Sequence, residues 1–185
     1  MADEIQVLGI SGSLRAGSYN TATLHAAIAL APAGMRIEAA DLADIPLYND
    51  DVRLQGWPAP VARLREQIRA ADALLFVTPE YNYSLPGVLK NAIDWVSRPP
   101  EQPFAGKPAA VMGASPGRFG TARAQYHLRQ SMVFLDAHLL NRPEVMIGGA
   151  DKLFDAEGHL TDETTRDYIR KLLQALQDWT LQLRR

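Results

Sequence analysis

The residue types best suited to chemistry gather in one short segment, residues 11–21, which reads SGSLRAGSYNT. Three serines, a threonine, an asparagine, two glycines and one arginine stand between an apolar run, residues 5–10, and an alanine-rich helical pattern. Connections in α/β units usually take about 2–6 residues, and this one is longer. The segment therefore holds more hydrogen-bond donors than a simple turn requires.

These donors suit a phosphate monoester. Gly12 and Gly17 are expected to let the backbone curl so that successive N–H groups face one point. Arg15 adds a permanent planar cation that can grip phosphate through two hydrogen bonds. The helix that follows presents its positive end to the same place. The hydroxyl donors are Ser11, Ser13, Ser18 and Thr21.

A second interpretation of this segment is a capped helix start, with Ser18 or Asn20 as the N-cap and the glycines merely turning the chain. We favour anion binding, because capping alone explains neither the length of the segment nor Arg15. Two other phosphate motifs are excluded by spacing. Residues 9–13, GISGS, do not fit G-x-G-x-x-G, and the sequence contains no G-x-x-x-x-G-K-[ST].

A second segment of interest, residues 78–87, reads TPEYNYSLPG and follows a continuous apolar run. Pro79 and Pro86 stiffen its two ends. A tyrosine side chain can pack against a flat ring, and Asn82 can both donate and accept hydrogen bonds at a ring edge. The alternative is an ordinary strand-to-helix turn that carries surface tyrosines.

The elements around these segments are predicted to be strands that alternate with helices. Alternation of this kind is typical of βαβ units, a parallel sheet and helices on both faces. We expect one domain, residues 1–185, with a doubly wound α/β fold whose five strands follow the flavodoxin-like order 2-1-3-4-5. The expected strands are 5–10, 35–40, 73–77, 108–112 and 145–147, and the expected helices are 20–31, 61–71, 88–96, 121–138 and 169–183. Ligands of such sheets bind beyond the carboxyl ends of the strands, where both segments lie.

Composition narrows the classes of function. The chain carries 19 basic and 21 acidic side chains, and a net charge of −2 gives no electrostatic footprint for nucleic acid or an anionic membrane. It has no cysteine, which excludes disulfides and cysteine nucleophiles and is compatible with the cytoplasm. No apolar run approaches a membrane span, and residues 1–4, MADE, are unlike a signal peptide. The four histidines match no metal motif, so we expect no metal.

The two segments together strongly resemble the NADPH-dependent FMN reductases, and within them the bacterial quinone and chromate reductases. The resemblance rests on SGSLRAGSYN and PEYNYSLPGVLKNAIDW, which occur in order and at the right separation. It continues through GASPGRFGTARAQYHLRQ to NRPEVM and so spans nearly the whole chain. It implies a flavodoxin-like fold, non-covalently bound FMN, and NAD(P)H as the co-substrate.

The resemblance assigns the FMN contacts to three segments. It places the phosphate against Ser11, Ser13, Arg15, Ser18, Asn20 and Thr21, and the isoalloxazine along Pro79, Glu80, Tyr81 and Asn82. Ser115 and Gly117 are the candidates for the pyrimidine end of the ring. Their turn, residues 115–120, departs from the glycine arrangement of many relatives, and an ordinary glycine-rich connection is the alternative. For the side chain of Glu80 we expect a solvated carboxylate.

The reaction implied by the resemblance takes place on FMN and needs no catalytic side chain. A hydride passes from NAD(P)H to flavin N5, and two electrons then pass to a quinone, chromate, an azo compound or a nitro compound by a ping-pong mechanism. Two alternatives stay open: a non-enzymatic electron carrier of the flavodoxin type, and a reductase that supplies free reduced flavin to a monooxygenase. The choice between NADH and NADPH also stays open, with Arg15, Arg118 and Arg123 as candidate contacts for the 2′-phosphate.

The resemblance also implies a homodimer or a homotetramer in the cytoplasm. Tyr83, Arg123, Tyr126 and Glu144 match polar positions that meet across subunits in relatives. The alternative is that these are ordinary surface side chains, because exposed charge pairs are common and weak.

Overall fold

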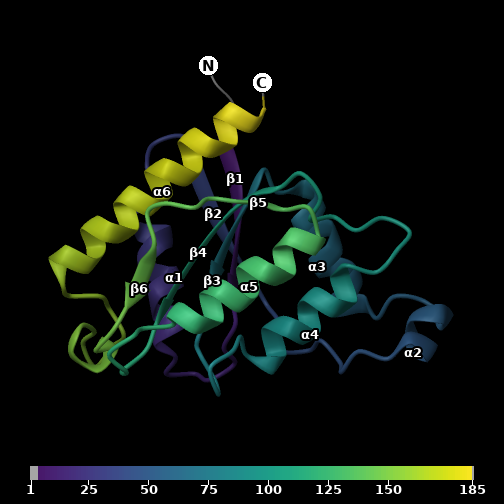
Figure 1. Cartoon of the computed structure of the whole chain (residues 1–185), viewed down its shortest axis with the longest axis horizontal. Helices are drawn as coiled ribbons and strands as arrows, with labels where there is room; N and C mark the ends of the chain where they lie inside the picture. The colour runs from purple at the N-terminus through teal and green to yellow at the C-terminus, as the bar shows by residue number, and fades with distance from the viewer. Residues whose placement is uncertain (1–3, 185) are drawn as a thin grey trace.

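The computed structural model describes residues 4–184 (Figure 1). Two parts of the sequence lie outside the described residues. They are residues 1–3, which belong to the segment that is unlike a signal peptide, and residue 185, the last residue of the predicted domain. The elements are β1 (Ile5–Ser11), α1 (Tyr19–Ala29), β2 (Met35–Ala40), α2 (Asp50–Gln55), α3 (Ala59–Ala70), β3 (Ala73–Val77), α4 (Gly87–Val96), β4 (Pro108–Ala114), α5 (Ala122–Phe134), β5 (His138–Leu139), β6 (Val145–Ile147), a 3-10 helix (Ala150–Lys152) and α6 (Glu163–Leu183).

A parallel sheet in the order β2-β1-β3-β4-β5 forms the centre of the molecule, which confirms the predicted flavodoxin-like order. In register, Ser11 at the end of β1 lies beside Val77 at the end of β3, and Val77 lies beside Met112 of β4. Three successive strands therefore end at one edge of the sheet. The loops that follow them emerge side by side at this edge.

Helices cover both faces of the sheet (Figure 1). Helices α1 and α6 pack on one face, and α3, α4 and α5 pack on the other. Strand β3 is buried along its whole length, as its continuous apolar run predicts for a central parallel strand. No helix within residues 4–184 is both long enough and apolar enough to cross a bilayer.

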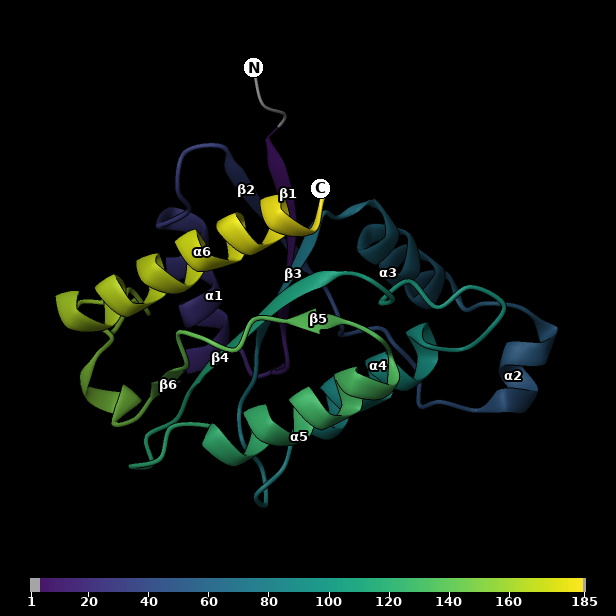
Figure 2. The same cartoon turned by 45° about the horizontal axis from the view of Figure 1, so that its top comes forward.

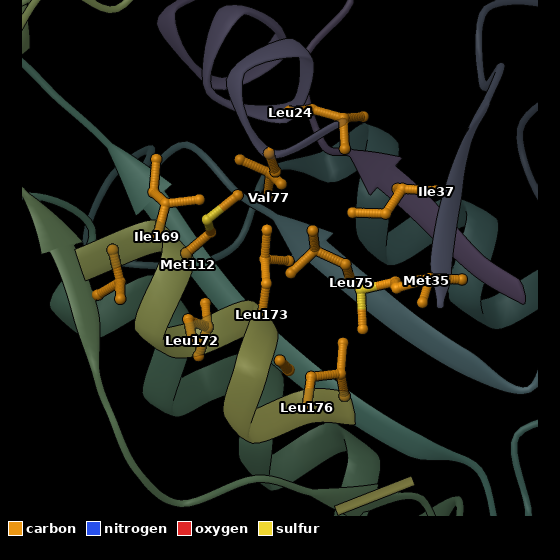
Figure 3. Close-up of a cluster of buried hydrophobic side chains, with 14 of the residues drawn as sticks. Leu24, Met35, Ile37, Leu75, Val77, Met112, Ile169, Leu172, Leu173 and Leu176 are labelled. Carbon is orange, nitrogen blue, oxygen red and sulfur yellow. The ribbon is translucent and has the colours of Figure 1, made fainter. Parts of the chain in front are cut away.

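The α6 face of the core shows why the sequence pattern works (Figure 3). Ile169, Leu172, Leu173 and Leu176 recur at helical spacing and are almost fully buried against the sheet and α1. Burial of one such side chain contributes roughly 1.5–3 kcal/mol relative to exposure. Asp162 starts the helix as its N-cap, since its carboxylate accepts a hydrogen bond from the N–H of Thr165.

The second half of the sheet differs from the prediction in one respect. Two short strands lie in succession along the outer edge of β4: β5 pairs at Pro108–Ala109 and β6 at Met112–Ala114 (Figure 2). The helix predicted for 121–138 therefore ends at Phe134, and β5 is the strand that the sequence reading missed. Asp136, with φ of 53°, adopts a left-handed conformation that stops the helix before this strand.

Helix α2 was also not predicted. It lies in the long connection between β2 and α3, where Asn49 caps its start and its side chains are not buried. An isolated short helix without an apolar face leaves no periodic pattern that sequence analysis can detect.

Candidate functional site

The three loops that follow β1, β3 and β4 converge on a cavity of about 200 Å³ at the carboxyl edge of the sheet. Its lining contains eight of the residues predicted from sequence: Ser13, Arg15, Ser18, Asn20, Pro79, Glu80, Tyr81 and Ser115. It also contains Tyr19, Ala114 and Pro116, which the prediction omitted although each is adjacent in sequence to a predicted residue. Segments more than 90 residues apart thus form one site.

The other four predicted residues lie outside this lining. Ser11 and Thr21 line an adjoining cavity of about 370 Å³, which extends from the first loop to the end of β2. Their hydroxyl groups are hydrogen-bonded to each other at 3.0 Å. Asn82 and Gly117 line neither cavity, although both belong to the loops that form the site.

The first loop is both a capped helix start and a cluster of free donors. The Ser18 hydroxyl oxygen accepts hydrogen bonds from the N–H groups of Asn20, at 3.2 Å, and Thr21, at 3.3 Å, so Ser18, one of the two candidates, is the N-cap of α1. Within residues 4–184, the backbone N–H groups of this loop that donate to no protein acceptor are those of Ser13, Leu14, Ala16, Gly17 and Tyr19. Capping therefore leaves most of the donors available to a ligand.

The side chain of Arg15 is exposed at this loop. Its guanidinium lies 5.7 Å from the centre of the Tyr19 ring, and it forms no ion pair with any residue in the described part of the chain. A permanent cation without a protein counter-charge, next to unused N–H groups, is the arrangement that an anion requires.

The glycines of this loop act differently from the prediction. Neither Gly12 nor Gly17 has a positive φ, so neither is required for an unusual backbone conformation. A Cβ at Gly12 would lie 3.0 Å from Cγ of Pro86 and 3.2 Å from Cδ of Pro79. Gly12 is therefore needed because the loops after β1 and β3 pack directly against each other.

The side chain of Asn20 joins the first loop to the end of β4. Its Nδ2 donates to the carbonyl of Ala114 at 2.9 Å, and its Oδ1 accepts from the N–H of Ala114 at 2.8 Å. This amide is buried, so any contact that it makes with a ligand is secondary to holding Ala114 and Ser115 at the cavity.

The second loop is a tight two-residue turn. Tyr81 and Ser84 exchange backbone hydrogen bonds at 3.0 Å, and the residues between them, Asn82 and Tyr83, have φ of 50° and 67°. Such values identify the mirror-image turn of short hairpins, which is uncommon for a tyrosine. The Ser84 hydroxyl is also hydrogen-bonded to His127 Nδ1 of α5 at 2.9 Å. The turn is therefore held from its far side by a helix.

Glu80 corrects our expectation of a solvated carboxylate, because its side chain is only 8% exposed. Its oxygens accept hydrogen bonds from the N–H groups of Arg123, at 3.0 Å, and Ala124, at 3.2 Å, and from Nε of Arg123 at 2.6 Å. The carboxylate thus caps the positive end of α5 and fixes the ring-side loop to it. The sequence offered no local signal for this contact, because its partners lie 43 or more residues away.

The polar residues matched to subunit contacts form pairs within this chain. The Arg123 guanidinium lies 3.8 Å from the centre of the Tyr83 ring and also forms the ion pair with Glu80. The Tyr126 hydroxyl donates to Glu144 at 3.0 Å, and this hydrogen bond to a carboxylate raises the pKa of Tyr126. Both pairs lie partly at the surface.

The third loop, residues 115–120, is shaped by Ser115. Its hydroxyl accepts a hydrogen bond from the N–H of Gly117 at 3.1 Å, while its backbone bonds to Ile147 and Ala150. Ser115 thus faces the cavity from a rigid position. The three loops together combine an anion site with a rigid, partly aromatic slot, an arrangement that suits an aromatic ring attached to a phosphate ester.

Comparisons with known proteins agree with this chemistry. The family model described as NADPH-dependent FMN reductase matches residues 5–152. An NAD(P)H-dependent FMN reductase of Pseudomonas aeruginosa, PA1204, is 68% identical over 184 residues and covers 100% of both chains. A quinone reductase of Escherichia coli is 49% identical, covering 95% of each chain.

Solved structures give the same result for the fold. The flavoenzyme FerB, an NAD(P)H:(acceptor) oxidoreductase of Paracoccus denitrificans, matches with a TM-score of 0.88 and 37% identity, covering 96% of this chain and 98% of its own. An oxidoreductase of Corynebacterium diphtheriae, 15% identical with a TM-score of 0.74, shares the fold.

Proposed function

The chain belongs to the NADPH-dependent FMN reductase family, and we propose that it binds FMN in the three-loop cavity and uses NAD(P)H to reduce quinones or similar acceptors. The family is one of oxidoreductases, so the chain is an enzyme of that class. We propose quinones as the first acceptors, because a relative of similar length is named a quinone reductase. Chromate, azo and nitro compounds are further acceptors that the resemblance in sequence implies.

The observation that carries the proposal is the set of unused donors in the first loop. The Arg15 guanidinium, the hydroxyl groups of Ser13 and Ser18 and the unused N–H groups of Ser13 and Tyr19 belong to residues that line the cavity. The other three unused N–H groups belong to the same loop, and the one acidic residue in the described lining, Glu80, is paired with Arg123. A phosphate monoester carries close to two negative charges at neutral pH and accepts several hydrogen bonds, so it satisfies this set. The residues present therefore fit the phosphate of FMN.

The second and third loops fit the ring. Pro79 is buried at the cavity, and the Tyr81 side chain is 53% exposed beside it, which supports placement of a flat heterocycle with one open face. Glu80 holds this loop on α5 and Asn20 holds the third loop on α1, so both walls keep their positions before a ligand arrives. Asn82 and Gly117, which belong to the same two loops, are assigned to the ring by resemblance.

The protein's part in the reaction is to bind and orient. FMN, when bound, supplies the chemistry by accepting a hydride from NAD(P)H at N5 and passing two electrons to the acceptor. The first loop holds the phosphate, the preformed loops hold the ring, and the exposed side of Tyr81 leaves room for a nicotinamide and then for a quinone. One open position used in turn by two substrates leads to a ping-pong mechanism, and no side chain has to act as a nucleophile or a general base.

The experiment that tests the proposal compares flavin retention in three proteins: the parent, Arg15→Ala, and Arg63→Ala. Arg63 is an exposed arginine of α3, outside the lining of the cavity, and controls for loss of one surface cation. We expect the parent and Arg63→Ala to keep FMN through dialysis and Arg15→Ala to lose it while staying folded. If Arg15→Ala retains flavin as well as the parent, the phosphate assignment is wrong.

The same material distinguishes the alternatives. FMN that stays with the protein during purification argues against a reductase that supplies free flavin. Anaerobic mixing of the FMN-loaded protein with NADPH and then with a quinone separates an enzyme from an electron carrier, because the carrier turns over NAD(P)H poorly. Bleaching by NADPH followed by recovery of the flavin colour on addition of quinone is the expected result.

We also propose a homodimer or homotetramer, with Tyr83, Arg123, Tyr126 and Glu144 at the contact between subunits. The support is that Tyr83 and Tyr126 are more than half exposed, although each is already ordered by a charged neighbour. Light scattering at several concentrations tests this, and a monomer throughout would overturn it. A cytoplasmic location stays a prediction, which cell fractionation tests.

A further inference from the structure

A second, larger cavity of about 570 Å³ adjoins the candidate FMN site. It lies between the start of α1 and residues 154–158, and it shares Ser18 and Tyr19 with the lining of the three-loop cavity. The sequence analysis did not single out residues 154–158. Ser18 and Thr21, which are assigned to the FMN phosphate, also line this cavity, whereas none of the residues assigned to the ring does.

The walls of this second cavity are well formed. The Tyr19 and Phe154 rings lie 5.6 Å apart between centroids, and both pack on the core below. Residues 154–160 form a tight hairpin, because Phe154 and Leu160 are bridge partners and Asp155 is hydrogen-bonded to His159 through both backbone and side chain. The two rings form an aromatic surface at the floor of a partly open cavity, and aromatic side chains of this kind stack with the bases of nucleotides.

The charges at the second cavity are mainly negative. Asp155 and Glu157 line it, together with His25, whereas neither lysine nor arginine is among its lining residues. Hydrogen bonds from His159, chiefly from its backbone N–H, hold the pKa of Asp155 below its ordinary value, so this carboxylate is ionised at neutral pH. The Glu157 carboxylate is exposed, and within residues 4–184 it forms no ion pair. Arg15, whose guanidinium lies 5.7 Å from the centre of the Tyr19 ring, is outside this lining and is the residue that we assign to the FMN phosphate.

We infer that this cavity, lined by Tyr19, Phe154 and Glu157, is the subsite for the adenosine half of the nicotinamide dinucleotide and that it selects NADH over NADPH. The inference rests on the proposed function, since it assumes that the nicotinamide reaches the ring site next door. The adenine stacks on the Tyr19–Phe154 surface, and the Glu157 carboxylate accepts a hydrogen bond from a ribose hydroxyl. Carboxylates play this part for the 2′-hydroxyl in other dinucleotide sites, where an arginine instead accommodates a 2′-phosphate.

Electrostatics gives the direction of selection. A 2′-phosphate in this cavity would place roughly two negative charges next to Asp155 and Glu157. The 2′-phosphate would also lie close to the FMN phosphate, because Ser18 lines both cavities. Like charges at such short range repel, and solvent screens only part of the repulsion.

The test measures the ratio of kcat/KM for NADPH to that for NADH in the FMN-loaded parent and in Glu157→Arg. We expect the ratio to rise about tenfold in the variant, because a repulsive charge is replaced by an attractive one, and to respond less at high salt. Glu66→Arg on α3 makes the same change of charge on a helix of the opposite face and should leave the ratio unchanged. An unchanged ratio in Glu157→Arg overturns the inference.

A second measurement does not depend on turnover or on flavin. Amide chemical shifts are followed while ADP-ribose, or ADP-ribose with a 2′-phosphate, is added to the flavin-free protein. We expect ADP-ribose to shift the amides of Ala16, Tyr19 and Ala156–Gly158, and the 2′-phosphorylated form to bind more weakly. Phe154→Ala should weaken both.

The outcomes separate the two proposals. The flavin-loaded protein could turn over NADH while ADP-ribose shifts amides outside the second cavity in the flavin-free protein. That result would overturn the adenosine subsite and leave the proposed function standing. Colourless protein without turnover would overturn the proposed function. The fragment titration would still decide whether the cavity binds an adenosine nucleotide, and tighter binding of the 2′-phosphorylated fragment would overturn the selection for NADH.

Discussion

The side-chain amide of Asn20 and the backbone of Ala114 form two hydrogen bonds, at 2.9 Å and 2.8 Å, across 94 residues of sequence. The Asn20 side chain thus bonds both the N–H and the C=O of Ala114, the last residue of β4, as the backbone of a neighbouring strand would. It places the first and third loops of the site at a set separation. Any ligand that contacts both loops therefore meets a site whose width Asn20 helps to determine.

The Asn20–Ala114 pairing predicts a large effect from a small substitution. Asn20→Asp replaces the donor with a carboxylate oxygen that faces the carbonyl of Ala114. Leaving a buried carbonyl without its donor costs about 1–3 kcal/mol in the free energy of unfolding, and the repulsion adds to this cost. Urea unfolding should show the loss, and FMN titration should show weaker binding. Asn49→Asp, at the N-cap of α2, where aspartate caps equally well, should behave like the parent.

Two glycines of the first loop give a matched pair of substitutions. Gly12→Ala places a Cβ 3.0 Å from Pro86 and 3.2 Å from Pro79, whereas Gly17→Ala meets only the flexible end of Arg15 at 3.2 Å. We expect Gly12→Ala to cost about 1–3 kcal/mol and to weaken FMN binding, because the loops after β1 and β3 must separate. Gly17→Ala should cost under about 0.5 kcal/mol. Equal effects on thermal unfolding would contradict the packing that we assign to Gly12.

Glu80 is predicted to matter more for stability than its partner Arg123. Glu80→Ala removes three hydrogen bonds and leaves two N–H groups of α5 without an acceptor, at a cost of about 1–3 kcal/mol. Arg123→Ala leaves both backbone hydrogen bonds to Glu80 in place, so we expect roughly half that cost. Free energies of unfolding from urea titration test the order. A larger loss for Arg123→Ala would show that the ion pair, not the helix cap, holds this loop.

The N-cap of α6 predicts a dependence on pH. Hydrogen bonds from the hydroxyl and the N–H of Thr165 hold the pKa of Asp162 below its ordinary value. The ionised carboxylate therefore stabilises the fold above the pKa of the unfolded chain, and this contribution is lost as the pH falls through the lower pKa of the folded state. Asp162→Asn should lower Tm at pH 7, with a difference from the parent that shrinks as the solution is acidified below about pH 4.

The control for this prediction is Asp151→Asn, an exposed acid in the 3-10 helix whose side chain accepts no hydrogen bond from an N–H group of residues 4–184. It should follow the parent across the same range of pH. A constant difference in Tm between Asp162→Asn and the parent, from neutral to acid conditions, would mean that the carboxylate charge contributes nothing.

The order of the sheet and the position of the site followed from the sequence alone. Continuous apolar runs identified the buried strands, helical spacing identified the helices between them, and right-handed crossovers left few ways to assemble the two. The site had to lie where the loops of adjacent strands meet. The capping hydroxyl of Ser18 was also predictable, because its partners lie two and three residues away.

Only the tertiary structure decided how the loops are held. The roles of Asn20, Gly12 and Glu80 depend on partners 43 to 94 residues away, and the short strand His138–Leu139 exists because β4 offers it an edge. Such contacts leave no periodic pattern, since they arise from the packing of elements rather than from propensities within one element. Local chemistry therefore identified the residues that we propose to contact a ligand, and long-range packing determined which residues keep them in place.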